Sequence, residues 1–312
     1  MCIPLLTSVG YDLTFATALV AVSGSLGIII PPSIPYIMYC NASGASISEL
    51  FLAGFLPGVL IALCLMVYSY IYCKIHGEDK DKLNAKCMEL RAKGLGTVLK
   101  EGFWALMSPV IILGGTMSGV CTATESAAVA VIYAFVLAKF VYREMTWDDL
   151  YRTLVNSAKS SASILFIISA STPFGWVLTL ENVTTTVSNA VFAVVKSPIL
   201  VYAAVVLILI ILGTFMESFT IIILTTPIFL PIVTAIGVDP VAYGLVLMFC
   251  ICIGGVTPPL AVCLFTACKI VKIRIEESIP DVFMVLGILL FVTILLMIFP
   301  QIALFLPSIA GT

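Results

Sequence analysis

Three short polar stretches interrupt apolar runs of this sequence, and their residue types are those that bind a hard cation. Their members are Ser25, Gly27 and Ser33, then Gly213, Thr214, Glu217 and Ser218, and then Gly254, Gly255 and Thr257. Glycines let the backbone turn so that carbonyl oxygens point inward, and hydroxyl and carboxylate oxygens add ligands. This chemistry predicts oxygen sites for a cation such as sodium. The alternative for the glycines is tight helix packing.

Glu217 is the most sharply constrained of these residues. It stands inside an apolar segment, where a carboxylate is costly unless it is paired, hydrated or protonated. We predict that it binds a cation or a proton, the alternative being a structural hydrogen bond to a nearby backbone end. The polar turn of Thr122, Thr124 and Glu125 allows the same functional interpretation, against that of a helix N-cap with an acidic first turn.

Two proline pairs stand close to the first and last stretches. They are Pro31-Pro32, within the apolar run 15–39, and Pro258-Pro259, within the apolar run 241–268. Each proline lacks an N–H and clashes with the preceding turn, so a helix breaks there. In a membrane such a break survives only where it is buried in protein or lines a polar cavity. We therefore predict two broken helices whose loops contact substrate, the alternative being kinks without ligands.

The two breaks belong to a longer similarity within the chain. A shift of 227 positions places Pro4 on Pro231, Thr7 on Thr234, Gly10 on Gly237, Asp12 on Asp239, Gly27 on Gly254, Pro31-Pro32 on Pro258-Pro259 and Glu49 on Glu276. This pattern indicates an internal repeat rather than a chance likeness of apolar helices. Residues 1–100 are the expected remainder of the first repeat, whose start is missing, and residues 101–312 the second.

Composition restricts the class of protein. Of 312 residues, 61% are hydrophobic and 10% charged, which is typical of a polytopic all-α membrane protein. The net charge of −2 gives no reason to expect nucleic-acid binding. The ten cysteines have no zinc or iron–sulfur spacing, and there is one histidine. We expect no enzyme activity and no cofactor other than coupling ions.

Hydropathy and charge predict the order of the helices and their orientation. We expect a return helix at 50–73, a pair at 103–119 and 127–141, an apolar segment at 163–180, a re-entrant hairpin with arms 200–212 and 221–236, and a last helix at 282–306. The stretch 74–100 and the start of 269–281 (Lys269–Arg274) are basic and therefore predicted cytoplasmic, the charged and amphipathic stretch 143–159 is predicted to be a cytoplasmic interfacial helix, and 183–196 is expected along the interface. The two broken helices then end on opposite sides, which predicts inverted repeats of an ion-transporter-type fold.

Several motifs together resemble the large membrane subunit of tripartite ATP-independent periplasmic (TRAP) transporters. They are Gly10-Tyr11-Asp12, Ile30-Pro31-Pro32-Ser33-Ile34, Ala53-Gly54-Phe55-Leu56-Pro57-Gly58, Thr122-Ala123-Thr124-Glu125-Ser126-Ala127-Ala128 and Gly254-Gly255-Val256-Thr257-Pro258-Pro259. The resemblance implies an elevator-type transporter in a bacterial inner membrane. It also implies sodium-coupled import of small organic acids, with a periplasmic solute-binding protein and a small four-helix membrane subunit as partners.

Two departures from that family qualify the resemblance. The family has further N-terminal helices and a first hairpin whose Gly/Ser-rich tip contributes to one sodium site; residues 2–10 are the expected end of that hairpin, and its tip is not in this sequence. Ala123 stands where family members often have proline.

The sequence therefore predicts a permease subunit for organic anions such as C4-dicarboxylates or sialic acid. The alternative is a sodium- or proton-coupled organic-anion transporter of a related inverted-repeat family that needs no binding protein. An ion channel and an intramembrane enzyme are further alternatives.

Overall fold

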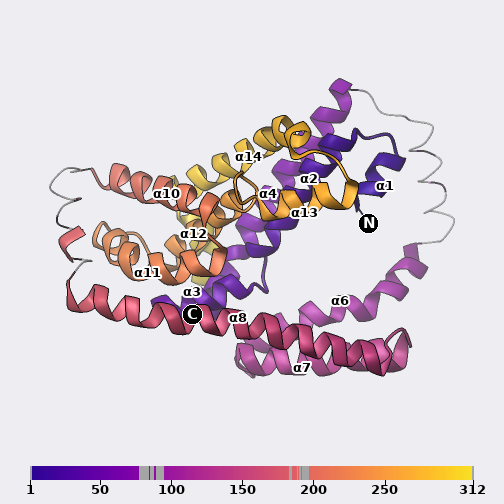
Figure 1. Ribbon diagram of the computed structural model, residues 1–312, viewed down its shortest axis with the longest axis horizontal. Helices are drawn as coiled ribbons and strands as arrows, with labels where there is room; N and C mark the ends of the chain where they lie inside the picture. Colours follow the sequence, from indigo (N-terminus) through magenta and orange to yellow (C-terminus); the bar gives the residue numbers. More distant parts are fainter. Residues whose placement is uncertain are drawn as a thin grey trace. The chain divides into compact units, whose positions relative to one another are not determined.

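The computed structural model describes residues 2–76, 84, 88, 95–182, 185–187, 189, 191 and 197–310. Every regular element within these ranges is a helix (Figure 1). The chain divides into two compact units, the first formed by Met1–Asp79 with Ala170–Thr312 and the second by Lys80–Ser169.

The first unit holds most of the helices. In chain order they are α1 (Cys2–Ser8), α2 (Leu13–Ser25), the short 3-10 helix η1 (Leu26–Ile28), α3 (Ile34–Ser43), α4 (Ile47–His76), α10 (Pro198–Phe215), α11 (Ser218–Ala235), α12 (Pro240–Gly254), α13 (Val262–Val271), α14 (Ile275–Ile298) and α15 (Gln301–Ala310). The second unit holds α6 (Leu95–Met117), α7 (Ala123–Val136), the π-helix η2 (Leu137–Val141) and most of α8 (Trp147–Leu180).

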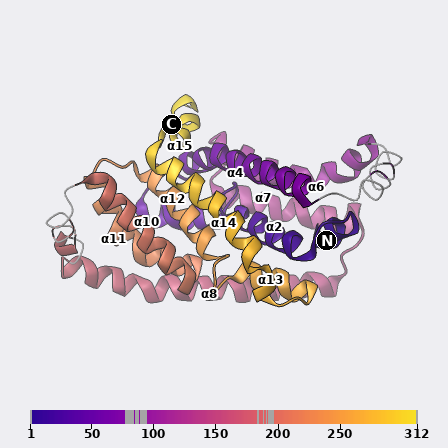
Figure 2. The same cartoon turned by 90° about the horizontal axis from the view of Figure 1, so that it is seen from above.

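Helix α12 is the core of the first unit. Every residue from Val241 to Gly254 is buried. A helix that is apolar on all sides must be covered on all sides, and α10, α14, α4 and α11 pack around it (Figures 1 and 2). The residues that follow the end of α12 at Gly254 are therefore attached to a firmly packed helix.

Helix length and composition fit a polytopic membrane protein. Among the described residues, five helices are long and apolar enough to cross a membrane: Ile47–His76, Ala123–Val141, Pro198–Phe215, Ser218–Ala235 and Ile275–Ile298. Large apolar side chains such as Leu63, Val67 and Phe291 are more than half exposed on these helices. Exposed apolar side chains of this kind are suited to contact with lipid and not with water.

Both predicted helix breaks are present. The first separates α2 and η1 from α3, and the second separates α12 from α13. The Pro31-Pro32 and Pro258-Pro259 peptide bonds are both cis.

The turn that precedes each broken helix has the same local structure. In both turns a threonine hydroxyl bonds to carbonyls three and four residues earlier, a glycine has positive φ, and an aspartate caps the next helix. The pairs, each 227 positions apart, are Thr7 and Thr234, Gly10 (φ 104°) and Gly237 (φ 90°), and Asp12 and Asp239.

The arms of the predicted hairpin are longer than expected. Helices α10 and α11 have 18 residues each, against predicted arms 200–212 and 221–236. The prediction stopped α10 at its first polar residues, but Gly213 and Thr214 continue the helix, because the Thr214 hydroxyl bonds to the carbonyl of Ile211. At about 27 Å each arm is nearly long enough to cross the hydrocarbon core. Length therefore does not require a re-entrant hairpin.

Two other boundaries were predicted wrongly. The interfacial helix 143–159 and the apolar segment 163–180 are one helix, the 34-residue α8, because the change from charged to apolar residues contains no helix breaker. The last helix was placed at 282–306, but α14 begins at Ile275, within the predicted loop 269–281, and ends before Pro300. Most of the predicted stretches 74–100 and 183–196 lies outside the described residues.

Candidate functional site

The turn between α10 and α11 packs directly on the second helix break. The Leu260 N–H donates to the Thr214 carbonyl, with an N···O distance of 3.1 Å. A Cβ added to Gly254 would lie 2.3 Å from the carbonyl carbon of Gly213, so the two backbones touch. Two of the three predicted polar stretches therefore form one locus.

The polar groups of this locus gather where two helices end. Helix α10 ends at Phe215 and α12 at Gly254. The Thr257 hydroxyl donates to the Ile253 carbonyl (2.7 Å), as the Thr214 hydroxyl does to Ile211 (2.8 Å). The carbonyls at a helix C-terminus carry partial negative charge, so two converging ends favour a cation.

The first break joins the same locus through α12. The buried Ser25, which ends α2, accepts a hydrogen bond from the Cys252 thiol (Sγ···Oγ 2.9 Å). Cys252 precedes Gly254, the end of α12, by only two residues. A third helix C-terminus therefore lies beside the second break.

The loop of the first break is held by its own side chains. The Ser33 hydroxyl donates to the Ile28 carbonyl and the Tyr36 hydroxyl to the Ile29 carbonyl, both at 2.7 Å. Gly27 is exposed, and a Cβ there would meet nothing within 4 Å.

The prolines of the two loops differ in exposure. Pro31 is buried, Pro258 is partly exposed, and Pro32 and Pro259 are exposed.

Glu217 has a structural role in the site. Its side chain is exposed and caps α11, accepting from the Phe219 N–H at 3.0 Å. The structural hydrogen bond that we weighed against a cation site is therefore present. Ser218 is the first residue of α11 and the partly exposed neighbour of this cap. The Glu217 side chain is nevertheless exposed. Cation binding by its carboxylate therefore stays a prediction.

The polar turn of residues 122–125 belongs to the second unit. Glu125 and Thr122 form a capping box at the start of α7, in which the Glu125 carboxylate accepts from the Thr122 N–H at 2.8 Å and the Thr122 hydroxyl accepts from the Glu125 N–H at 3.3 Å. Thr124 is exposed. The N-cap interpretation of this turn is confirmed.

Sequence reasoning missed two residues that hold the site together. Cys252 was not among the predicted site residues, although the shift of 227 positions places Ser25 on it. That coincidence could have suggested the contact. The hydrogen bond of the Leu260 N–H could not be predicted, because an apolar side chain gives no indication of the tertiary partner of its backbone N–H.

Comparison with known proteins gives one family over nearly the whole chain. Residues 1–302 match the family described as "Tripartite ATP-independent periplasmic transporter, DctM component".

Relatives show the same similarity. The chain is 38% identical over 308 residues to the "Isethionate TRAP transporter permease protein DctMQ" of Oleidesulfovibrio alaskensis, covering 98% of this chain and 47% of that protein. It is 36% identical to the "C4-dicarboxylate TRAP transporter large permease protein DctM" of Pseudomonas aeruginosa, over 97% of this chain and 69% of that protein. It is 33% identical to the "Sialic acid TRAP transporter large permease protein SiaM" of Vibrio cholerae, over 96% of this chain and 69% of that protein. The chain thus spans between about half and about two thirds of the length of these relatives.

We predict that Gly254→Ala destabilises the first unit, because its methyl group would overlap the backbone of Gly213. The overlap involves backbone, which cannot rotate away, so the cost is expected near the upper end of overpacking, about 3 kcal/mol. The measurement is the thermal unfolding midpoint of the detergent-solubilised protein. Gly255→Ala is the control, because its Cβ would lie 3.4 Å from the Ile251 oxygen, an ordinary contact. Equal losses in the two variants would contradict the prediction.

A second prediction concerns the capping box. Thr122→Val removes the hydroxyl that accepts from the Glu125 N–H and should cost about 1 kcal/mol. Thr124→Val, the same change two residues later on an exposed side chain, should leave stability unchanged. Denaturant titration of both variants checks this, and an equal effect would show that the cap does not stabilise α7.

Proposed function

Because this chain belongs to the DctM component family of tripartite ATP-independent periplasmic transporters, we propose that it is the permease part of a sodium-coupled importer of small organic acids. As a transporter component with several membrane-spanning helices, it is a multi-pass protein of the inner membrane and not an enzyme. The coupling ion, the substrates, the partners and the mechanism are our proposals.

The observation that carries the sodium proposal is the convergence of three helix C-termini. Helices α2, α10 and α12 end beside one another, linked by the Ser25–Cys252 and Thr214–Leu260 hydrogen bonds. Oxygens of Ser25, Gly27, Gly213, Thr214, Glu217, Ser218, Gly254, Gly255 and Thr257 are the proposed ligands. Carbonyl ends and hydroxyls supply most of these oxygens, Glu217 provides the one carboxylate, and such an oxygen set suits a monovalent hard cation.

Inverted repeats of the kind that alternating-access transporters use are part of this proposal. The matching turns 227 positions apart support it, and so does the contact between Ser25 and Cys252, which occupy equivalent positions. A two-fold axis brings a residue against its own equivalent where the axis passes. We place the axis at this contact and propose that the unit around it moves as an elevator. The re-entrant hairpin is proposed from the packing of its tip on the buried end of α12.

The substrate is proposed to lie between the two breaks, beside Pro31, Pro32, Ser33, Pro258 and Pro259. Helices α3 and α13 begin there, and helix N-termini favour anions. Lys and Arg are absent from residues 24–34 and 254–262, so bound sodium would neutralise the substrate. Relatives are named for isethionate, a C4-dicarboxylate and sialic acid, which makes small organic anions the substrate class to test.

The words "tripartite" and "periplasmic" in the family's description support two partners. We propose a small four-helix membrane subunit and a periplasmic protein that delivers the substrate. With the positive-inside rule, the stretches 74–100, 143–159 and 269–281 are proposed to face the cytoplasm, chiefly because of the lysines and arginines of 74–100 and of Lys269–Arg274. The competing function is a coupled organic-anion transporter that works without a binding protein.

The experiment is uptake of labelled organic acids into proteoliposomes that contain the permease, its small subunit and the binding protein. The permease is tested both as this chain and within a full-length relative's sequence. We expect uptake only with an inward sodium gradient and the binding protein together. Uptake that needs sodium but not the binding protein would favour the competing function, and conductance far above transporter turnover would favour a channel.

A matched pair of threonines tests the cation site. Thr257→Val removes a hydroxyl from the second break, whereas Thr266→Val removes one from α13, although both hydroxyls bond at 2.7 Å to the carbonyl four residues earlier. Loss of one ligand to a charge, worth about 2 kcal/mol, should raise the half-saturating sodium concentration at least about tenfold for Thr257→Val only. Equal sodium dependence in both variants would remove Thr257 from the site.

A further inference from the structure

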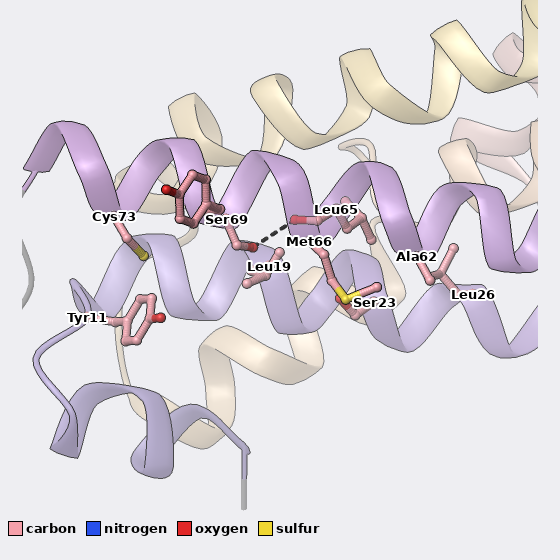
Figure 3. Close-up of a pocket in the computed structure, with 10 residues that line it drawn as sticks. Tyr11, Leu19, Ser23, Leu26, Ala62, Leu65, Met66, Ser69 and Cys73 are labelled. Carbon is pink, nitrogen blue, oxygen red and sulfur yellow. Dashed lines mark hydrogen bonds between the residues drawn. The ribbon is translucent and has the colours of Figure 1, made fainter. Parts of the chain in front are cut away.

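Away from the candidate site, the first unit contains a cleft of about 510 Å³ between α2 and α4 (Figure 3). We call it the α2–α4 cleft. One wall is a face of α4 from Ala62 to Cys73, and the other runs from Tyr11, just before α2, to Leu26, just after it. Nothing in the proposed transport cycle uses this cleft.

The cleft is polar at one end and apolar at the other. The helices run antiparallel, so that Tyr11 lies near Cys73, and Leu26 lies near Ala62 (Figure 3). The Ser69 hydroxyl, between these ends, donates to the Leu65 carbonyl of its own helix at 2.8 Å. Toward the Ala62 end the lining side chains Leu26, Ala62 and Met66 are apolar, and Ser23 is the one hydroxyl residue beside them (Figure 3).

The polarity of the cleft matches the depth of α4 in a bilayer. Helix α4 has 30 residues, which is about 45 Å, the thickness of a bilayer with its headgroups. Ala62 is at its middle, and Cys73 is about 16 Å further along, at the hydrocarbon boundary. The cleft therefore covers the hydrocarbon of one leaflet, with its polar end at headgroup depth.

Aromatic rings lie beside the headgroup end. The Phe15 and Tyr72 rings stack at 3.6 Å between centroids, and the His76 ring stacks on Tyr72 at 4.1 Å. Aromatic side chains favour the membrane–water interface, which agrees with the depth assigned to this end.

Charges of both signs stand near the same end. Lys74 is exposed and follows the lining residue Tyr70 by four positions, on the same side of α4. Asp12 is exposed next to Tyr11, and its hydrogen bond from Thr14 lowers the pKa of its carboxyl, so it is ionised at neutral pH. The same Thr14 hydroxyl lies 2.8 Å from an oxygen of Asp281, so the carboxylates of Asp12 and Asp281 both stand beside it. A headgroup with a phosphate and a primary ammonium would find a partner for each.

The length of the cleft suits an acyl chain. Its α4 wall from Ala62 to Cys73 extends over about 16 Å, which is about half the thickness of the hydrocarbon core and so about the depth of one leaflet.

We propose that the α2–α4 cleft binds one phospholipid, with an acyl chain between the helices and an ethanolamine headgroup at Tyr11, Tyr70 and Lys74. The site requires that the chain spans a bilayer, but it does not depend on sodium or on substrate.

The test is native mass spectrometry of the 312-residue chain, exchanged into detergent with equal amounts of phosphatidylethanolamine, phosphatidylcholine and phosphatidylglycerol. We expect one retained phosphatidylethanolamine. Ala62→Trp fills the apolar end of the cleft and should lower that occupancy at least tenfold. Leu63→Trp places the same ring one position away, on an exposed side chain outside the lining, and should leave it unchanged.

Further variants and a folding control test whether the loss of lipid is specific to the cleft. Leu19→Trp fills the cleft from α2 and must reproduce the loss, while circular dichroism verifies that each variant is folded. Lys74→Gln should lower retention of the lipid without changing the fold. Retention that survives both cleft-filling variants, or a preference for phosphatidylcholine or phosphatidylglycerol, would overturn the proposal. Because the assay contains neither sodium nor substrate, failure of the transport proposal would leave its result unaffected.

Discussion

A helix interrupted inside a membrane leaves backbone groups with no water to bond, and the first unit is built around satisfying them. At the first break the Ser33 and Tyr36 hydroxyls bond to the freed carbonyls of residues 28 and 29. At the second break the Leu260 N–H finds its acceptor on another element, the carbonyl of Thr214. The second break is therefore complete only when the α10–α11 turn is seated on it.

This contact between two backbones explains the glycines at positions 213 and 254 better than a need for backbone flexibility does. Gly213 and Gly254 are placed where two backbones must touch for the Leu260–Thr214 hydrogen bond to form, and a methyl group on Gly254 would prevent it. Because α12 is buried along its length, the break cannot move away from the turn. The end of α10 and the end of α12 are thus held against each other.

The sequence was sufficient to predict both breaks, because paired prolines forbid a continuous helix whatever surrounds them. It misplaced the boundaries that depend on weaker signals. The first arm of the hairpin was predicted to end at Leu212 and the second to begin at Ile221, yet the polar Thr214 continues α10 by bonding to its own helix. Helix α8 was divided where charge changes, although nothing in its backbone breaks there. The pairing of the hairpin turn with the second break could not be predicted, since one sequence contains no record of which distant backbone groups meet.

The proposed cation site relies on partial charges of helix ends and not mainly on charged side chains. A binding site made from fixed carboxylates would be costly at membrane depth whenever the ion left. Three helix C-termini supply negative potential that exists with or without the ion, because their carbonyls are already oriented by the helices. Glu217, the one carboxylate of the turn, is stabilised by capping α11, accepting from Phe219. The partial positive charge of the α11 N-terminus favours a carboxylate at this position.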